Sequence, residues 1–220
     1  MSKSDRSGDA RHEALAQAQR EQRAKQVRVR VLTWGAIALV VGGLAVATAF
    51  IIANASAERE QIAEAAAAPI DGVEEQPDQS ASHVPALPEP TPNLATGVLL
   101  PPSGGDHDPA WLNCGVYDSP VPTANAVHSL EHGAVWVTYA PGLGEADVAA
   151  LRTSVEGYAY SILSPFEDLA APVVLTAWGV QLEVDSATDE RVDVFLAKYV
   201  QGEQTPEPGA ACSSGVGEPL

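Results

Sequence analysis

The longest apolar run in the chain lies near its N-terminus, where residues 31–53 carry no charged side chain. At about 1.5 Å per residue this run forms a helix of roughly 34 Å, which is long enough to cross a bilayer. The residues before it are basic, and those after it carry Glu58, Glu60 and Glu64 against Arg59. Because basic flanks stay in the cytoplasm, the pattern predicts a transmembrane helix with a cytoplasmic N-terminus and an extracytoplasmic C-terminal domain.

A cleaved signal peptide is the alternative interpretation of this segment. Ala53-Asn54-Ala55 and Ala55-Ser56-Ala57 both satisfy a small-x-small cleavage rule. However, the basic region is long and the apolar run exceeds the roughly 7 to 15 residues of a typical signal peptide. We therefore favour an uncleaved anchor in the cell membrane. In both cases the C-terminal domain is expected to be exported from the cytoplasm.

The distribution of proline and charge predicts five regions along the chain. Nine of the seventeen prolines lie between residues 69 and 109, where large apolar residues are few, so this part is expected to be an extended stalk. An Ala- and Glu-rich segment before Pro69 continues the helix. The predicted regions are a basic cytoplasmic tail (1–30), a transmembrane helix (31–53), a juxtamembrane helix with a Pro-rich stalk (54–105), an extracytoplasmic globular domain (106–212) and a disordered tail (213–220).

Within residues 106–212 the hydrophobic periodicity predicts alternating helices and strands. In 145–156, for example, Val148, Leu151 and Val155 fall at i, i+3 and i+7, which indicates an amphipathic helix. Helices are predicted at 123–132, 145–156 and from about 186 to 201, and strands at 134–139, 158–163, 173–178 and 180–184. The expected fold class is α+β, with helices packed on one face of a small, mostly antiparallel sheet.

Charge and cysteine content restrict the classes of function. Residues 1–30 carry a local charge of +4, which leaves −21 for the rest of the chain, so we expect no binding to nucleic acid. Cys114 and Cys212 are too far apart for a CxxC motif. Outside the cytoplasm such a pair is expected to form a disulfide. The alternative is that Cys114 is a nucleophile paired with a nearby histidine.

Histidines carry the candidate chemistry. His128 and His132 lie four residues apart in HSLEHG, so a helix presents both rings on one face, as in zinc-binding helices. Glu131 falls between this face and the apolar face, where it is expected to support the ligands or act as a base. His107 is a third candidate ligand, and His83 in the stalk is a weaker fourth.

His107 lies on a loop between Asp106 and Asp108, and both carboxylates are expected to support its ring. Met1 is the sole methionine and the cysteines are expected to be oxidised, so soft sulfur ligands are missing. Imidazole and carboxylate suit Zn(II) or Cu(II). The alternative is structural: the rings hydrogen-bond backbone carbonyls or the two aspartates without metal.

The string H-x-x-E-H also matches a zinc protease pattern, in which the glutamate activates a metal-bound water. Such a protease needs a longer helix and a further glutamate ligand, whereas Gly133 and the strand-like AVWVTY end this helix early. A metal-dependent hydrolase is therefore a minority hypothesis, and whether the chain is an enzyme stays open.

Several runs together resemble a known family. These are HDPAW at 107–111, GVYD at 115–118 and AVHSLEHGAV at 126–135, with His83-Val84-Pro85 before them and QTPEPG at 204–209 with Cys212 after them. They are similar to the motifs of the bacterial domain-of-unknown-function family three-one-zero-five. The resemblance implies one N-terminal membrane helix and an exported domain, and it supplies no activity. Its motifs include the same four histidines.

The sequence thus predicts a single-pass, membrane-anchored extracytoplasmic protein that binds a metal or small ligand through a histidine cluster. A non-catalytic subunit of the cell envelope is the alternative. Such a subunit would hold a partner protein through an exposed sheet face or join a membrane complex through residues 31–53.

Overall fold

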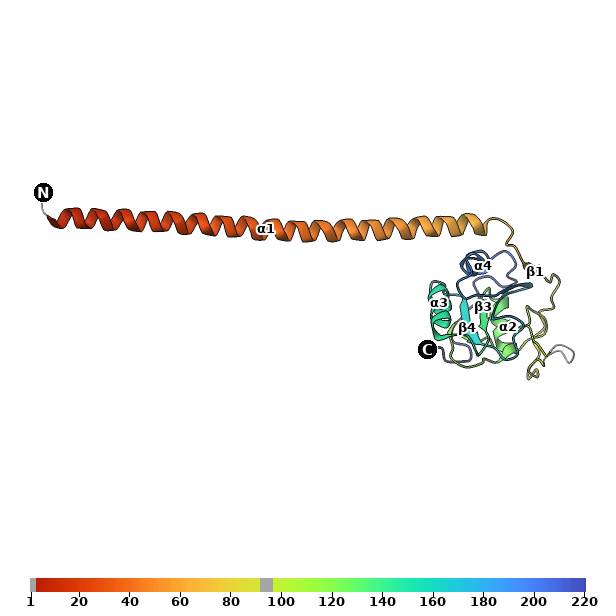
Figure 1. The fold of residues 1–220 in the computed structure, drawn as a ribbon. Coiled ribbons are helices and arrows are strands. Elements are labelled where there is room, and N and C mark those ends of the chain that lie inside the picture. Colours follow the sequence, from red (N-terminus) through yellow and green to blue (C-terminus); the bar gives the residue numbers. More distant parts are fainter. Residues whose placement is uncertain (1–2, 92–96) are drawn as a thin grey trace. The chain divides into compact units, whose positions relative to one another are not determined.

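The computed structural model describes residues 3–91 and 97–220 (Figure 1). The chain divides into two units, Met1–Glu58 and Arg59–Leu220. Residues 1–2 of the predicted cytoplasmic tail and residues 92–96 of the predicted stalk lie outside the described part.

A single helix, α1 (Lys3–Ala66), contains most of the predicted basic tail, the predicted transmembrane segment and the short helix behind it. It ends three residues before Pro69, as the sequence predicts. The part from Gln19 to Ala66 is long and apolar enough to cross a membrane. Length and composition are the basis of this statement, and a signal sequence has the same two properties.

The second unit is built on a mixed sheet. Among the described residues, six strands follow the spatial order β1-β6-β5-β3-β4-β2. They are β1 (Val73–Glu75), β2 (Gly115–Val116), β3 (Val135–Tyr139), β4 (Ser161–Pro165), β5 (Val173–Ala177) and β6 (Val180–Val184). Strands β1, β6, β5 and β3 pair antiparallel, whereas β4 runs parallel to β3 and β2 parallel to β4. The predicted class of helices on a small sheet is confirmed.

The helices cover both faces of this sheet, which corrects the expectation that they pack on one face. Helices α3 (Glu145–Glu156) and α4 (Arg191–Tyr199) pack on one face with most of the aliphatic strand residues. Helix α2 (Thr123–Glu131) packs on the other, against Trp136 and Ile162. Every residue of β3, β4 and β5 is buried. A strand covered on both faces shows no hydrophobic alternation, so its sequence does not reveal the second layer.

The Pro-rich segment lies along the sheet instead of standing apart as a stalk. Strand β1 pairs with β6, and the Gln181 side-chain amide donates to the Pro101 carbonyl at 2.8 Å. Leu99 N–H donates to Asp168 O at 2.7 Å. An extended segment needs no core of its own when an existing sheet supplies its hydrogen bonds. The folded unit therefore begins well before residue 106.

The last eight residues are also ordered against the domain, although the sequence predicts a disordered tail at 213–220. Asn113 N–H donates to Val216 O at 2.8 Å, and Leu220 N–H donates to Val116 O at 2.9 Å. Gly, Ser and Pro are typical of disordered ends, but here backbone hydrogen bonds hold them. The folded unit therefore extends to the C-terminal residue.

Cys114 and Cys212 form the predicted disulfide, with their Cα atoms 5.3 Å apart and a sequence separation of 98. Cys114 N–H also donates to Cys212 O at 2.8 Å. The bond fixes the segment after α4 to the start of β2, on the face of the sheet that α2 covers.

Candidate metal site

Helix α2 places two histidines and a glutamate at its C-terminal end. The helix begins after Pro122, which cannot donate an N–H and therefore suits a helix start. It ends in a Schellman motif, in which Gly133 N–H donates to Leu130 O at 2.9 Å and Ala134 N–H to Ser129 O at 2.9 Å. The chain then enters β3 directly. This turn fixes His132 as the C-cap residue, directly after the last residue of the helix.

Gly133 is required at this turn, because its φ is +93° and a Cβ there would meet the Gln201 amide and the Thr205 methyl group. We expect Gly133→Ala to lower the free energy of unfolding by about 1–3 kcal/mol, since a non-glycine residue in this region of backbone space is strained. Urea unfolding measures the change. Gly142→Ala is the matched control, because a Cβ at Gly142 meets no atom within 4 Å. Equal unfolding midpoints for the two variants would contradict the prediction.

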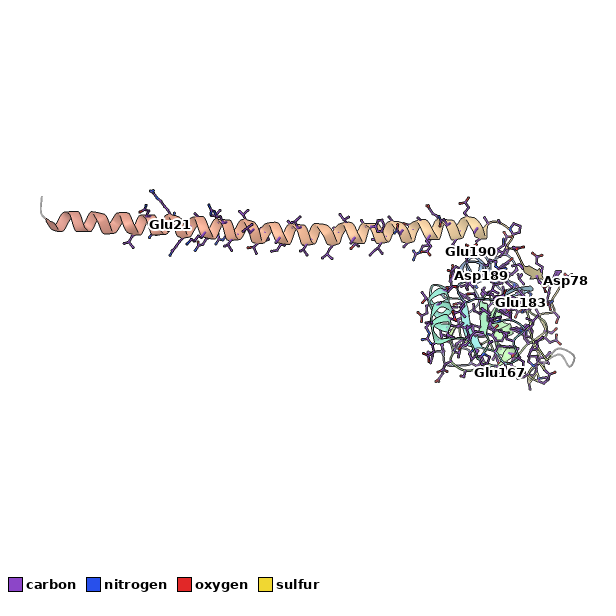
Figure 2. The ribbon with its side chains drawn as sticks, in the orientation of Figure 1. Glu21, Asp78, Glu167, Glu183, Asp189 and Glu190 are labelled. Carbon is purple, nitrogen blue, oxygen red and sulfur yellow. A yellow bond between two sulfur atoms is a disulfide. The ribbon has the colours of Figure 1, made fainter. Side chains whose placement is uncertain are left out.

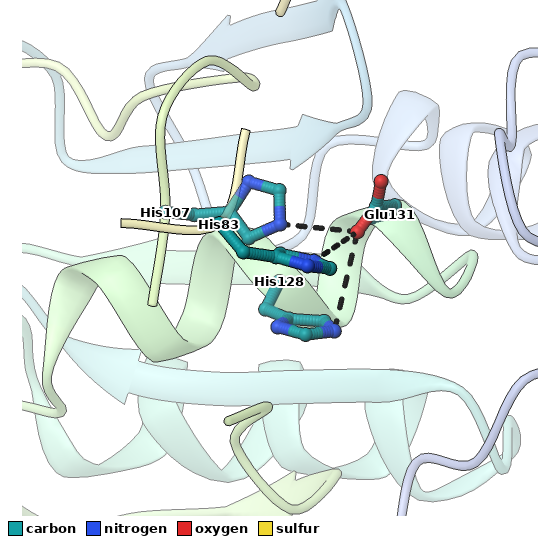
Figure 3. Close-up of side chains that lie close together, drawn as sticks. All are labelled: His83, His107, His128 and Glu131. Atoms are coloured by element: carbon teal, nitrogen blue, oxygen red, sulfur yellow. Dashed lines mark hydrogen bonds and ion pairs between the residues drawn. The ribbon is translucent and has the colours of Figure 1, made fainter. Parts of the chain in front are cut away.

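Three imidazoles surround one carboxylate oxygen of Glu131 (Figure 3). Nε2 of His107 lies 3.0 Å from Oε2 of Glu131, and Nε2 of His83 lies 3.3 Å from the same atom. Nε2 of His128 lies 4.0 Å away. His83 and His107 are neighbours through a parallel β-bridge, although 24 residues separate them in sequence. One ligand atom from each of these four residues lies within 4.8 Å of the others, so the cluster can hold a metal ion.

Backbone carbonyls fix the orientation of three of the rings. Nδ1–H donates to a carbonyl in each case: His107 to Gly105 at 2.8 Å, His128 to Asp108 at 2.6 Å, and His132 to Ala211 at 2.6 Å. A carbonyl oxygen accepts and never donates, so the proton is on Nδ1. In a neutral ring Nε2 then carries a lone pair. Metal-bound histidines are typically held in this way.

These lone pairs face other lone pairs at two places. Nε2 of His107 lies 3.0 Å from the Glu131 oxygen, and Nε2 of His128 lies 3.0 Å from Nε2 of His132. Two acceptors at this separation repel unless a cation lies between them, either a proton or a metal ion. The cluster therefore has the chemistry of a cation site.

The cluster is buried. His107, His128, His132 and Glu131 are each no more than 4% exposed. Burial lowers the pKa of His128 below its usual value, the hydrogen bond to the Asp108 carbonyl acts in the opposite direction, and the neighbouring imidazoles lower the pKa further. His128 therefore stays neutral at pH 7, which is the form that binds metal.

His83 covers the cluster on its solvent side. Its ring stacks on that of His128 with centroids 4.6 Å apart and planes 13° from parallel, and its side chain is 44% exposed. Trp178 contacts His107 edge to face, and Trp111 packs beside His132 at 5.3 Å between centroids. The two tryptophans thus border the cluster, and His83 is its most exposed histidine.

The structure brings all four predicted histidines together and changes the expected role of the acidic residues. Glu131 lies at the centre of the cluster, whereas the sequence predicts that it supports the ligands or acts as a base. The Asp108 carboxylate accepts the Ala110 N–H at 2.9 Å, so its carbonyl, and not its side chain, supports a ring. Asp106 is exposed and accepts the Ser80 hydroxyl at 2.8 Å.

Sequence reasoning misses Glu207. Its Oε2 lies 3.8 Å from Nε2 of His132, and its N–H donates to the Glu131 carbonyl at 3.0 Å. Glu207 forms a second candidate metal group with Glu131 and His132. The available signal is the QTPEPG run at 204–209, which the sequence offers as part of the family resemblance and not as a source of ligands.

Most other acidic side chains of the domain point outward. Glu167, Glu183 and Glu190 lie on its outside (Figure 2) and are exposed. Glu131 is 3% exposed, so its carboxylate has lost its water and requires positive partners. This contrast separates the cluster from an ordinary solvated acidic surface.

Comparison with known proteins identifies a family. The sequence model of the family described as protein of unknown function (DUF3105) matches residues 99–214. The match contains His107, His128, Glu131 and His132, while His83 precedes it. No curated protein and no solved structure matches the chain. The matched segment is more than half of the 220 residues, so the family assignment is confirmed and the chain belongs to the DUF3105 family.

Proposed function

We propose that this chain is a membrane-anchored protein whose extracytoplasmic domain binds a divalent transition metal ion, Zn(II) or Cu(II). The observation that carries the proposal is the convergence of three imidazole nitrogens and one carboxylate oxygen within 4.8 Å of one another. Ligands of one Zn(II) ion lie about 2.0–2.2 Å from it and hence about 3.3 Å apart in a tetrahedral site. The distances from Glu131 to His83 and His107 lie near this value.

The donor types favour these two ions. Imidazole nitrogen with carboxylate oxygen suits Zn(II) and Cu(II), whereas Mg(II) and Ca(II) prefer oxygen ligands throughout. Hydrogen bonds from Nδ1 to carbonyls prepare Nε2 of His107 and His128 for the ion before it arrives. A prepared site loses less conformational entropy on binding.

Anchoring is supported by the side chains of α1. Apolar residues between Val31 and Ile52 are about half to four-fifths exposed, among them Leu39 at 80% and Val46 at 72%. Lipid is the environment that such a surface requires. The disulfide supports a domain outside the cytoplasm, because thiols stay reduced inside it. The basic residues before Val31 support a cytoplasmic N-terminus.

The alternative of a scaffold subunit has two routes to a partner. One is an exposed sheet face: strands β3, β4 and β5 are fully buried, so the part of the sheet open to a partner lies at β1 and β6, where Glu74, Glu75 and Glu183 are exposed. Joining a complex through the apolar helix remains as a prediction for native-membrane crosslinking.

The test is the metal content of the full chain, purified in detergent with an affinity tag that contains no histidine. We expect zinc or copper at one equivalent or more per chain. His83→Ala should weaken binding at least about 10-fold, as loss of even a supporting group does. Because His83 is exposed, folding should be preserved, as near-UV circular dichroism will show.

Ser82→Ala is the matched control, since Ser82 is an exposed neighbour on the same segment. Adding Zn(II) or Cu(II) to metal-free protein should raise the melting temperature, because a ligand of the folded state stabilises it. Metal-free protein with a melting temperature that neither ion changes would refute the proposed function.

A further inference from the structure

The cluster offers six candidate ligands, which is more than the four that one tetrahedral ion uses. The first group of candidate ligands, which we call the inner set, consists of Glu131 with His83, His107 and His128. The second group, which we call the outer set, consists of Glu131 with His132 and Glu207. Within each group the ligand atoms lie within 4.8 Å of one another, and Glu131 belongs to both.

From this arrangement we propose that the cluster binds two divalent ions, one at the inner set and one at the outer set, with the Glu131 carboxylate shared between them. The inference rests on the proposed metal-binding function and deepens it. Carboxylates commonly bridge two ions that lie about 3.5–4 Å apart.

The two lone-pair contacts support two positions for positive charge. One contact joins His107 to Glu131 and the other joins His128 to His132, each at 3.0 Å. These contacts share no atom, so a single ion placed in one of them leaves the other without a cation. His128 lies at the junction, 4.0 Å from Glu131 Oε2.

Hydrogen bonds to the backbone also hold the outer set in place. His132 donates its Nδ1–H to Ala211 O at 2.6 Å, and Glu207 N–H donates to Glu131 O at 3.0 Å. Cys212, next to Ala211, is fixed by the disulfide. These contacts aim one imidazole and one carboxylate at the same place.

The two positions differ in solvent access. The Glu207 side chain is 55% exposed, whereas His107 and His128 are buried. The outer ion has two protein ligands besides Glu131, so water fills its remaining coordination positions. In zinc enzymes a coordination position held by water is the one that a substrate takes. We therefore expect the outer ion to bind more weakly and to exchange faster than the inner one.

The experiment titrates the metal-free full chain with Cu(II) and records bound copper together with the electron paramagnetic resonance signal. We expect two ions per chain, with a signal well below that of the bound copper, because two neighbouring Cu(II) ions couple magnetically. Glu207→Gln or His132→Ala should leave one ion, with its full uncoupled signal. Glu203→Gln, an exposed neighbour, is the control that keeps two coupled ions.

The outcomes separate this inference from the proposed function. One Cu(II) per wild-type chain overturns the two-ion centre and leaves the proposed function standing. Two ions without magnetic coupling also overturn it, because ions that share Glu131 must be close. A chain that binds no copper and no zinc overturns both. Glu207 is exposed, so its substitution gives an answer even if His132→Ala impairs folding.

Discussion

Replacing Cys114 and Cys212 together with serine is expected to lower the free energy of unfolding by about 4 kcal/mol. The bond closes a loop of 98 residues, and the chain-entropy model gives about 4.7 kcal/mol for a loop of this length. Urea unfolding of the full chain in detergent, followed by near-UV circular dichroism, measures the loss. Buried Trp136 contributes to this signal through its packing against Phe166.

The wild-type chain with reductant should unfold at the same urea concentration as the double variant, and reductant should not change the double variant. Ser213→Ala, an exposed neighbour of Cys212, is the matched control. An unchanged midpoint in the double variant would contradict the prediction. Trapping free thiols in intact cells tests the location as well, because both cysteines should resist alkylation if the domain is exported.

The disulfide also connects fold stability to the metal site. It fixes the segment whose Ala211 carbonyl orients His132 and whose Glu207 faces the same ring. In the double variant this segment gains freedom, so the outer ion should be lost at a lower chelator concentration than in the wild type, while the loss of the inner ion should be unchanged. The same disulfide therefore raises both the stability of the domain and the affinity of the outer set for its ion.

The sequence predicts those elements that are defined by local features, namely hydrophobic periodicity and a glycine or proline that ends the element. Helix α3 has the predicted bounds of 145–156, and β6 those of 180–184. Helix α2 ends at Glu131, and Gly133 forms the turn behind it, as a glycine after a helical run predicts. Strand β4 lies about two residues further along than expected, since Tyr158 to Tyr160 form the turn before it.

Strands β1 and β2 and both ends of the domain are not predicted from the sequence, because their structure depends on residues that are distant in sequence. Strand β1 is three residues long and contains Glu74 and Glu75, which have low strand propensity. It becomes a strand because the edge of β6 offers free hydrogen-bonding groups. The C-terminal residues are held in the same way by Asn113 and Val116.

The ligands of the candidate site are predicted in part. The spacing of His128 and His132 on one helix is local information, and both are found in the cluster. The position of Glu131 at its centre depends on where His83 and His107 arrive from other segments. Spacing alone cannot tell a ligand from a supporting residue, because that distinction is set by tertiary contacts.

Glu131→Gln is expected to weaken metal binding by more than about 100-fold at both positions. The substitution keeps the shape of the side chain and removes the charged oxygen that the inner and outer sets share. Loss of groups that merely orient ligands already costs about 10- to 100-fold. Titration of the metal-free full chain measures the affinities. Glu156→Gln, at the exposed end of α3, is the matched control and should bind both ions as the wild type does.

The same variant decides between metal binding and a structural role for the histidines. If protonated rings pair with Glu131 in the absence of metal, removing its charge leaves a buried positive charge unpaired, and stability falls by about 3–5 kcal/mol even in chelator. If the rings are neutral ligands, the buried carboxylate is a cost in metal-free protein. Glu131→Gln is then at least as stable as the wild type in chelator and less stable once Zn(II) is added. The sign of the difference in chelator therefore separates the two cases.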